Sequence, residues 1–513
     1  MGSQLFRTKS VDQLIAGTQE SGYRLKKVLG PWSLTAMGVG AVIGTGLWAL
    51  TGTAALGVSV EAPSIWRAPV LDLILHGAEA SGIYGRPGAG SAIALSYFLV
   101  AIACGFAALC YAELASMIPV AGSAYTYSYA TMGELVAWII GWDLVLEYAV
   151  SNMAVAVGFS GYLNALLENL GFPLPEWLSE PVFRAGEATG AVFNLPAFVI
   201  VMILTMILVV GIRESARANN VMVVIKLGAI LIFIFGAARY VSLDNLRPFA
   251  PHGAQGVLTG AALVFFAYIG FDSISTAAEE CRNPQRDMPI AIISTLVVCM
   301  VLYVTVALVL GGIVPFFVQA DDGEMVPNPI YKNKEDASFA VALKAVGLGK
   351  LEYLITVGAL LGMISSILVY QMGQARIWFA MSRDRLLPDF FSRVHPKYQT
   401  PYVSTWIAGI VVAIPAGLWD IGDLAELADI GTLFAFSLVC VAVLVLRRKR
   451  PDLKRGFRVP FMPVTPILGI LSCLILMGSL PLRTWGRFFV WLALGLVIYF
   501  SYGRKRSTLH QPE

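Results

Sequence analysis

The chain has 513 residues, of which 57% are apolar and only 13% are charged, and its mean hydropathy is +0.72. Ordinary soluble proteins carry about 25% charged residues, so this composition excludes that class and indicates a protein embedded in lipid. The net charge of +3 comes from basic residues spread along the chain without an aromatic-interleaved patch, a pattern that does not favour nucleic-acid binding.

Apolar runs of about 20 residues, which is the length of a helix that crosses the hydrocarbon core, recur along the whole chain. The twelve predicted spans begin near Trp32, Ser91, Gly133, Phe193, Ala218, Gly256, Pro289, Lys350, Tyr402, Leu424, Met462 and Trp485. We therefore predict an all-α membrane protein with twelve transmembrane helices.

The segments outside the spans predict the orientation. Residues 1–31 are polar and basic and show no cleavage site of the signal-peptide kind, so we expect the first span to remain in the mature protein. Most of the 36 Lys and Arg residues fall on the alternate loops that include both termini. Because cytoplasmic loops carry the excess of these residues, we predict that both termini are cytoplasmic.

The first span contains a run of glycines, MGVGAVIGTG, with Gly38, Gly40, Gly44 and Gly46. Glycine lowers helix stability by about 1 kcal/mol relative to alanine, so we predict that the helix is interrupted here. Close packing against another helix is the alternative, since small residues four apart let membrane helices approach each other. A dinucleotide-binding loop would need a preceding strand in a soluble βαβ unit, and this run lies within a span.

A long connection, residues 57–90, follows the first span. Its apolar stretch VLDLIL is too short to cross the bilayer, so we expect an interfacial or external helix there. Residues 316–349, which mix acidic residues, lysines and prolines, predict a second external loop.

The third span carries two carboxyl groups. Asp143 and Glu147 are four residues apart and therefore lie on one helix face. Carboxylates within a membrane are normally directed to the interior of the helix bundle, which makes them candidates for proton binding. A structural role, in which the carboxylate is tied to a neighbouring helix end or hydroxyl, is the alternative.

The fifth span carries a lysine, Lys226, between Val221–Ile225 and Leu227–Phe235. An ammonium near the bilayer midplane costs about 2.5–3.5 kcal/mol on insertion scales, so it is tolerated mainly when it faces a cavity or a partner oxygen. A lysine that snorkels to the lipid headgroups is the alternative. Lys226 is nevertheless about eight residues inside its span, or roughly 12 Å along a helix. It therefore indicates a functional site, and a solute carrier is the leading hypothesis.

The sixth span is also interrupted. In AALVFFAYIGFDSIST, Gly270 follows an aromatic cluster and polar residues then replace aliphatic ones. Two glycine-interrupted spans at matching positions of two halves point to the binding site of a transporter. An unwound turn exposes N–H groups that favour a carboxylate and carbonyl groups that favour an ammonium, so a zwitterionic amino acid satisfies both.

Five long strings resemble the amino acid, polyamine and organocation superfamily, and within it the bacterial members of the cationic amino acid transporter family. The resemblance runs from about Leu25 to Arg458. The strings are GAVIGTGLWALTG from Gly40, ELASMIPVAGSAYTYSYATMGE from Glu113, GWDLVLEYAV from Gly141, FFAYIGFDSISTAAEECRNPQRDMPIAI from Phe265 and GQARIWFAMSRDRLLP from Gly373.

The resemblance implies a LeuT-type fold with two inverted repeats of five helices and two extra helices. The repeats would comprise residues 32–238 and 256–446, the extra helices residues 462–503, and a cytoplasmic tail residues 504–513.

The resemblance also implies the substrate site. Backbone N–H groups of the first span would bind the carboxylate of the substrate; they belong to Ile43, Gly44, Thr45 and Gly46. The Thr45 hydroxyl would add a hydrogen bond. The amino group would meet the carbonyls of Phe266, Ala267 and Ile269, with the Phe266 ring as a gate.

Lys226 matches the lysine that proton-coupled relatives carry on the fifth helix, where the ammonium takes the place of a sodium ion. It would contact the Gly40 carbonyl and lie near Ser365 and Ser366. Glu147 lies in the matching LEY context and is the second candidate, both for proton coupling and for substrate contact.

We therefore predict a secondary active transporter of amino acids in the cell membrane, with proton symport by alternating access. An amino acid exchanger and a non-transporting sensor on the same fold are the alternatives. A channel would need a continuous polar lining, and an intramembrane enzyme would need a nucleophile and base or a metal motif, neither of which the sequence contains. We expect no metal and no cofactor apart from the coupling proton. A neutral substrate is favoured over a cationic one. A monomer is expected, although a small accessory membrane protein is left open.

Overall fold

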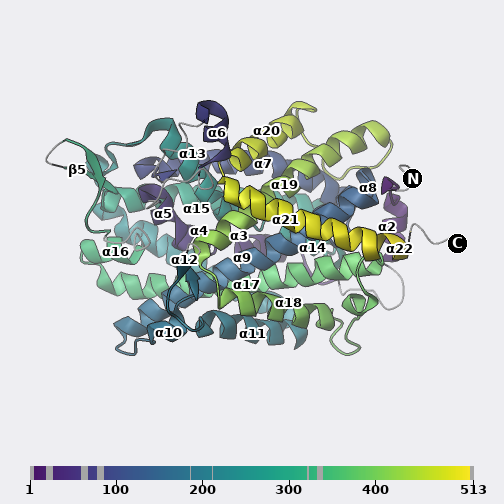
Figure 1. The fold of residues 1–513 in the computed structure, drawn as a ribbon, viewed down its shortest axis with the longest axis horizontal. Coiled ribbons are helices and arrows are strands. Elements are labelled where there is room, and N and C mark those ends of the chain that lie inside the picture. Colours follow the sequence, from purple (N-terminus) through teal and green to yellow (C-terminus); the bar gives the residue numbers. More distant parts are fainter. Residues whose placement is uncertain are drawn as a thin grey trace.

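The computed structural model is a bundle of helices that run side by side along its longest axis (Figure 1). The structure describes residues 5–18, 27–58, 68–77, 86–184, 187–210, 212–320, 323–331 and 339–508. The first and last helices of the described chain, α2 (Val11–Gly17) and α22 (Arg504–Arg506), lie at the same end of the bundle, which we call the terminal face. The other end, the opposite face, carries α10 (Glu176–Ser179), α16 (Phe339–Ala345) and β5 (Phe317–Gln319).

The structure confirms the all-α membrane fold, and each predicted span corresponds to a helix or a broken helix. The first five are α3 (Pro31–Val42) with α4 (Thr45–Trp48) and α5 (Leu50–Leu56), then α7 (Ile93–Met117), α9 (Glu134–Asn169), α11 (Leu195–Val210) and α12 (Ile212–Ala237). The next five are α13 (Gly253–Val264) with η6 (Phe265–Tyr268), α14 (Ser273–Thr276) and η7 (Ala278–Glu280), then α15 (Pro284–Ile313), α17 (Gly349–Arg383), α18 (Tyr402–Ala416) and α19 (Ile421–Lys449). The last two are α20 (Val464–Gly478) and α21 (Leu482–Ile498).

Within the described ranges, eight helices are long and apolar enough to cross a membrane. The spans formed by α11, α18 and α20 are shorter apolar helices, and the first span is broken into three pieces. Because five spans is an odd number, the chain begins the sixth span at the face opposite to the one where it begins the first span. The broken spans, first and sixth, therefore run in opposite directions through the middle of the protein.

Short elements occupy the two faces. The loop after α5 forms a hairpin of β1 (Gly57–Val58) with β2 (Arg86–Pro87). It also contains a short helix, α6 (Val70–His76), at the apolar stretch for which an interfacial or external helix was predicted. The rest of that loop, residues 59–67 and 78–85, lies outside the described residues. The remaining strands form two antiparallel hairpins, and the remaining helices are single turns or short segments. They are β3 (Phe183–Arg184), β4 (Glu187–Ala188), β6 (Met325–Pro327), α2 (Val11–Gly17), α8 (Ala124–Thr131), α22 (Arg504–Arg506), η3 (Gly90–Ala92), η4 (Ala238–Tyr240), η5 (Leu243–Leu246), η9 (Asp389–Ser392) and the π-helical turn η10 (Tyr499–Gly503).

The second external loop is described only in part. It forms the hairpin of β5 and β6, and α16 follows this hairpin. Residues 321–322 and 332–338 of the predicted loop lie outside the described part of the chain.

The breaks in the two central spans have local causes. In the first, α3 ends at Val42, and Ile43 and Gly44 leave the helical conformation before α4 begins at Thr45. In the sixth, Ile269 is extended and Gly270 has φ = 117°, a left-handed conformation that glycine adopts without the steric cost of a side chain. Both breaks therefore lie near the middle of their spans, between helical segments on either side.

A buried ion pair ties the first and sixth spans to the eighth at the terminal face. The Arg376 Nη2 of α17 donates to Glu280 Oε1 at 2.6 Å, and both side chains are almost fully buried. The Glu280 carbonyl accepts hydrogen bonds from the N–H groups of Val28 and Leu29, just before α3. Removing one partner of a buried ion pair is strongly destabilising, so this contact fixes the terminal end of α3.

Candidate substrate and coupling-ion site

The two broken helices meet at their breaks. A Cβ atom built on Gly46 of α4 would lie 2.4 Å from the Cα of Ala267 in η6, which is closer than real Cβ contacts allow. On the other side, a Cβ atom on Gly270 would lie 2.7 Å from the Cβ of Ala41. The glycines thus let the backbone of one break lie directly against the backbone of the other.

The break in the first span presents backbone N–H groups. Those of Ile43 and Gly44 donate within the chain, to the carbonyls of Val39 and Val42 at 3.1 and 3.0 Å. Those of Thr45 and Gly46 begin α4, where a helix has no intrahelical acceptor. No carbonyl of the described residues accepts from these two groups. The partial positive charge of a helix N-terminus is therefore available for an anion at Thr45 and Gly46.

The carbonyl groups around the breaks are held by two tyrosines. The hydroxyl of Tyr303 in α15 lies 2.8 Å from the Val42 carbonyl and 2.9 Å from the Ala267 carbonyl. Tyr370 of α17 donates to the Ile269 carbonyl at 2.8 Å. A tyrosine hydroxyl has only one proton, so Tyr303 can fully satisfy only one of its two acceptors. One carbonyl between the broken helices is thus left able to accept from a substrate ammonium.

Tyr303→Phe is expected to destabilise the protein, because it leaves the Ala267 carbonyl without its donor, whereas the Val42 carbonyl keeps its hydrogen bond from the Gly44 N–H. An unsatisfied buried polar group costs about 1–3 kcal/mol, which should appear as a lower thermal unfolding midpoint in detergent. Tyr398→Phe is the matched control, since Tyr398 lies at an exposed position and stacks on His395. Equal midpoints for the two variants would show that the Tyr303 hydroxyl does not hold the breaks together.

Lys226 lies beside the end of α3. Its side chain is fully buried, and its Nζ donates to the carbonyl of Gly40 at 2.8 Å and to that of Ile43 at 2.9 Å. The last carbonyls of a helix lack intrahelical donors and carry the partial negative charge of the helix. The ammonium therefore occupies the position where a small cation would stabilise the broken end of α3. Among the described residues, the titratable side chain that interacts electrostatically with this ammonium is the Cys299 thiol of α15.

The two serines of α17 have different partners. The Ser366 hydroxyl donates to the Gly40 carbonyl at 2.8 Å and therefore shares this acceptor with Lys226. The Ser365 hydroxyl donates instead to the Asn219 Oδ1 of α12, at 2.7 Å. The structure thus places Ser366 directly at the lysine site and Ser365 next to it, on the other side of Gly40.

Two predicted substrate contacts involve side chains rather than the backbone. The Thr45 hydroxyl lies 3.5 Å from the Val155 carbonyl of α9, and its side chain packs close to Gly158. The Phe266 side chain is 3% exposed, within η6. The structure therefore directs the Thr45 hydroxyl toward the third span, while the backbone of Thr45 remains at the break.

Glu147 lies among other acidic side chains. It is 1% exposed, and neither carboxylate oxygen has a hydrogen-bond partner among the described residues. Asp143 and Asp272 are close enough to repel a charge on it. The Thr432 hydroxyl beside it donates to the Ala428 carbonyl of its own helix. The structure thus brings Glu147 to the terminal half of the sixth span near Asp272, whose Oδ2 accepts from Tyr148 at 2.5 Å.

Three residues of the site, Tyr303, Tyr370 and Asn219, were not predicted from the sequence. Tyr303 occurs in the apolar run CMVLYVTVALVL and Tyr370 in SSILVYQMG. A hydroxyl in such a run needs a hydrogen-bond partner when it is buried, and this is the signal that could have identified both residues. Their acceptors, carbonyls of the broken helices, are visible only in the folded chain.

Comparisons with known proteins identify the family of this chain. A protein-family model described as amino acid permease matches residues 29–499. The chain belongs to the amino acid permease family. Over 512 residues, covering all of both proteins, it is 47% identical to the branched-chain amino acid permease BcaP of Bacillus subtilis (strain 168).

Other relatives are named as transporters of other compounds. The permease is 44% identical to the methylthioribose transporter of Bacillus subtilis (strain 168), over 99% of this chain and 100% of that protein. It is 35% identical to the vacuolar cationic amino acid transporter 4 of Arabidopsis thaliana, over 88% of this chain and 68% of that protein. The chain is thus a multi-pass membrane protein of a transporter superfamily, as its sequence resemblance predicted, and its relatives are carriers rather than enzymes.

Proposed function

We propose that this permease is a proton-coupled symporter of neutral amino acids in the cell membrane, working by alternating access. The observation that carries the proposal is the buried Lys226 ammonium on the carbonyls of Gly40 and Ile43, beside two broken helices that meet at Gly46 and Ala267. No cofactor other than the proton is needed.

The proposed site uses backbone groups to bind the two charges of an amino acid. The substrate carboxylate is bound by the N–H groups of Thr45 and Gly46 at the start of α4. The ammonium is bound by the carbonyls of Phe266, Ala267 and Ile269, one of which replaces its hydrogen bond from Tyr303. A substrate bound at its carboxylate by the first span and at its ammonium by the sixth joins the two spans. Binding therefore favours the state in which the two breaks are closed on the substrate.

The proposed coupling follows from the contacts of Lys226. A protonated ammonium donates to the carbonyls of Gly40 and Ile43 and so holds the end of α3 against α12, while the Ser366 hydroxyl holds it against α17. A neutral amine has lost its charge and one of its protons, so both charge-assisted hydrogen bonds weaken. Loss of the proton to the cytoplasm therefore releases α3 and opens the terminal face. Movement of one proton with a neutral amino acid supplies about 2.3 kcal/mol per 100 mV, or roughly fiftyfold accumulation.

The substrate is proposed to be an amino acid with an uncharged side chain. One relative is named for branched-chain amino acids and another for methylthioribose. An amino acid carries the carboxylate and ammonium that the two breaks complement, whereas a sugar thioether has neither group. The carboxylates of Asp143 and Glu147 have no hydrogen-bond partner among the described residues, and we assign them no contact with the substrate's side chain.

The terminal face is proposed to be cytoplasmic, because the loops on that face carry most of the Lys and Arg residues. The working unit is proposed to be one chain, since both broken helices and the lysine come from the same polypeptide.

The proposal is tested with purified protein in liposomes. Uptake of labelled valine, isoleucine, alanine, arginine and methylthioribose is measured with and without an imposed inward proton gradient. The proposal predicts accumulation of the neutral amino acids that requires the gradient. Uptake that requires amino acid preloaded inside the liposomes and does not depend on the proton gradient would identify an exchanger. Binding without uptake would identify a sensor.

A further inference from the structure

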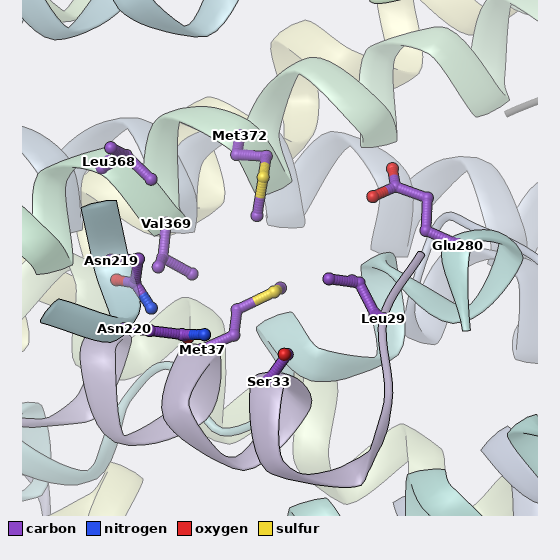
Figure 2. Close-up of a pocket in the computed structure, with 9 residues that line it drawn as sticks. All are labelled: Leu29, Ser33, Met37, Asn219, Asn220, Glu280, Leu368, Val369 and Met372. Carbon is purple, nitrogen blue, oxygen red and sulfur yellow. The ribbon is translucent and has the colours of Figure 1, made fainter. Parts of the chain in front are cut away.

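A narrow pocket runs from the terminal face toward the coupling site. It is a gap of about 310 Å³ between the side chains of α3, α12 and α17, a volume that includes open solvent, and it has room for little more than one water molecule. Figure 2 shows Glu280 and Leu29 at one end of this pocket and Asn219 at the other, with Met37 and Met372 between them. Because Glu280 ends the sixth span at the terminal face, Asn219 lies at the inner end of the pocket.

Asn219 joins the three helices that line the pocket. Its Nδ2 donates to the Ala36 carbonyl of α3 at 3.3 Å, and its Oδ1 accepts from the Ser365 hydroxyl of α17 at 2.7 Å. The residue is 3% exposed. A single side chain of α12 therefore uses both its donor and its acceptor to hold α3 and α17 together.

The Asn219–Ser365 pair separates the pocket from Lys226. A Cβ atom on Gly40 would lie 2.7 Å from Asn219 Oδ1 and 2.9 Å from Ser365 Oγ, so the pair covers this residue. The carbonyl of the same Gly40 accepts from Lys226 Nζ. Asn219 and Lys226 are seven residues apart on α12, which is two helical turns or about 10.5 Å along the axis. The pair thus forms the layer between the pocket and the ammonium.

We propose that Asn219 is a positioning residue that closes the cytoplasmic route to Lys226, so that water reaches the lysine only when the Asn219–Ser365 pair breaks. This rests on the proposed function of Lys226 as the proton carrier. Two layers then hold α3. The inner layer consists of the hydrogen bonds from Lys226 and Ser366 to the Gly40 carbonyl. The outer layer consists of the hydrogen bonds of Asn219 with the Ala36 carbonyl and the Ser365 hydroxyl. Proton release from Lys226 requires the Asn219–Ser365 pair to break first and admit water, and loss of the proton then frees the rest of α3.

The groups around the route favour water over a fixed proton acceptor. Among the described residues, the titratable group that interacts electrostatically with Lys226 is the Cys299 thiol. The carboxylate of the pocket, that of Glu280, lies at the far end and is paired with Arg376. No carboxylate among the described lining residues lies next to Asn219. The proton therefore leaves Lys226 by transfer to water that enters past Asn219.

The test measures access of water-soluble reagents to positions on either side of the pair. Val223 lies one turn beyond Asn219 toward Lys226, whereas Met37 lines the pocket itself; both side chains are 4% exposed. Val223→Cys and Met37→Cys are each labelled with a membrane-impermeant thiol reagent in inside-out vesicles. The protein without either added cysteine gives the background, because its own cysteines are buried.

Asn219→Ala is expected to speed labelling of Val223→Cys about fivefold to tenfold, while labelling of Met37→Cys stays within about twofold. Ser365→Ala removes the same hydrogen bond from the other helix and should reproduce the effect if Asn219→Ala does not fold. Asn220→Ala is the matched control, since Asn220 lines the same pocket on the next position of α12. Unchanged labelling of Val223→Cys with both Asn219→Ala and Ser365→Ala, or an equal increase with Asn220→Ala, would overturn the proposal.

This test is independent of proton coupling. If Lys226 does not carry the proton, Lys226→Met will retain gradient-driven uptake, but the labelling difference at Val223→Cys will still report whether Asn219 closes the route. If Lys226 does carry the proton, Asn219→Ala should in addition raise proton leak into liposomes without amino acid. No increase in that leak, together with faster labelling, would overturn the link between the pair and proton release.

Discussion

Lys226→Met is expected to lose gradient-driven accumulation of amino acid in liposomes, by at least about tenfold, while still binding substrate. Methionine keeps the length and apolar stem of the side chain but has no ammonium to donate to the carbonyls of Gly40 and Ile43. The substrate contacts at Thr45, Gly46 and the sixth span are made by backbone atoms, which this substitution leaves in place. Coupling should therefore be lost before binding, and counterflow of labelled substrate should remain measurable.

The matched control is Lys350→Met, at the exposed start of α17. It makes the same chemical change outside the bundle and should leave accumulation within about twofold. Gradient-dependent accumulation by Lys226→Met at the level of the unmodified protein would show that another group carries the proton, and Glu147 would then be the next residue to substitute.

Gly46→Ala is expected to reduce uptake by about tenfold or more. The new methyl group would lie 2.4 Å from the Ala267 Cα and 2.8 Å from its nitrogen, and these are backbone atoms that cannot rotate away. Overpacking of this kind typically costs about 1–3 kcal/mol, and here it separates the two breaks that form the substrate site. We expect the loss mainly as a raised substrate concentration for half-maximal uptake.

Gly161→Ala on α9 is the control for this variant, because a Cβ atom there meets no atom within 4 Å. Alanine at that helical position should leave uptake unchanged or slightly raise stability. Normal substrate affinity in Gly46→Ala would mean that the close approach of α4 to η6 is not needed for binding.

The membrane spans could be predicted from the sequence because each depends on a local property, the length of an apolar run. The breaks could be predicted only approximately. Of the glycines in the first span, Gly38 and Gly40 lie within α3, and the helix ends two residues later, at Val42. A Cβ atom on Gly38 would lie 2.5 Å from atoms of Ile274 and Thr295. Both interpretations of this glycine run therefore apply: the helix is interrupted at Gly44, and Gly38 packs closely against neighbouring side chains.

The contact of Lys226 with the Gly40 carbonyl agrees with what the family resemblance implied, but the neighbouring contacts needed the structure. Adjacent residues on a helix point about 100° apart, so Ser365 and Ser366 cannot both face the lysine. The fold directs Ser366 to the Gly40 carbonyl and Ser365 to Asn219. Nothing in the sequence relates position 219 to position 365, because their distance is set by the packing of α12 against α17.

The central claim is tested most directly by measuring proton and substrate movement in the same liposomes, with a pH-sensitive dye trapped inside. Added valine is predicted to acidify the interior of liposomes that contain the unmodified protein. Isobutylamine, which lacks the carboxylate, and isovalerate, which lacks the ammonium, should not produce this carrier-dependent signal. Lys226→Met should bind valine without acidification. Valine uptake without proton movement, or equal acidification with Lys226→Met, would contradict the account.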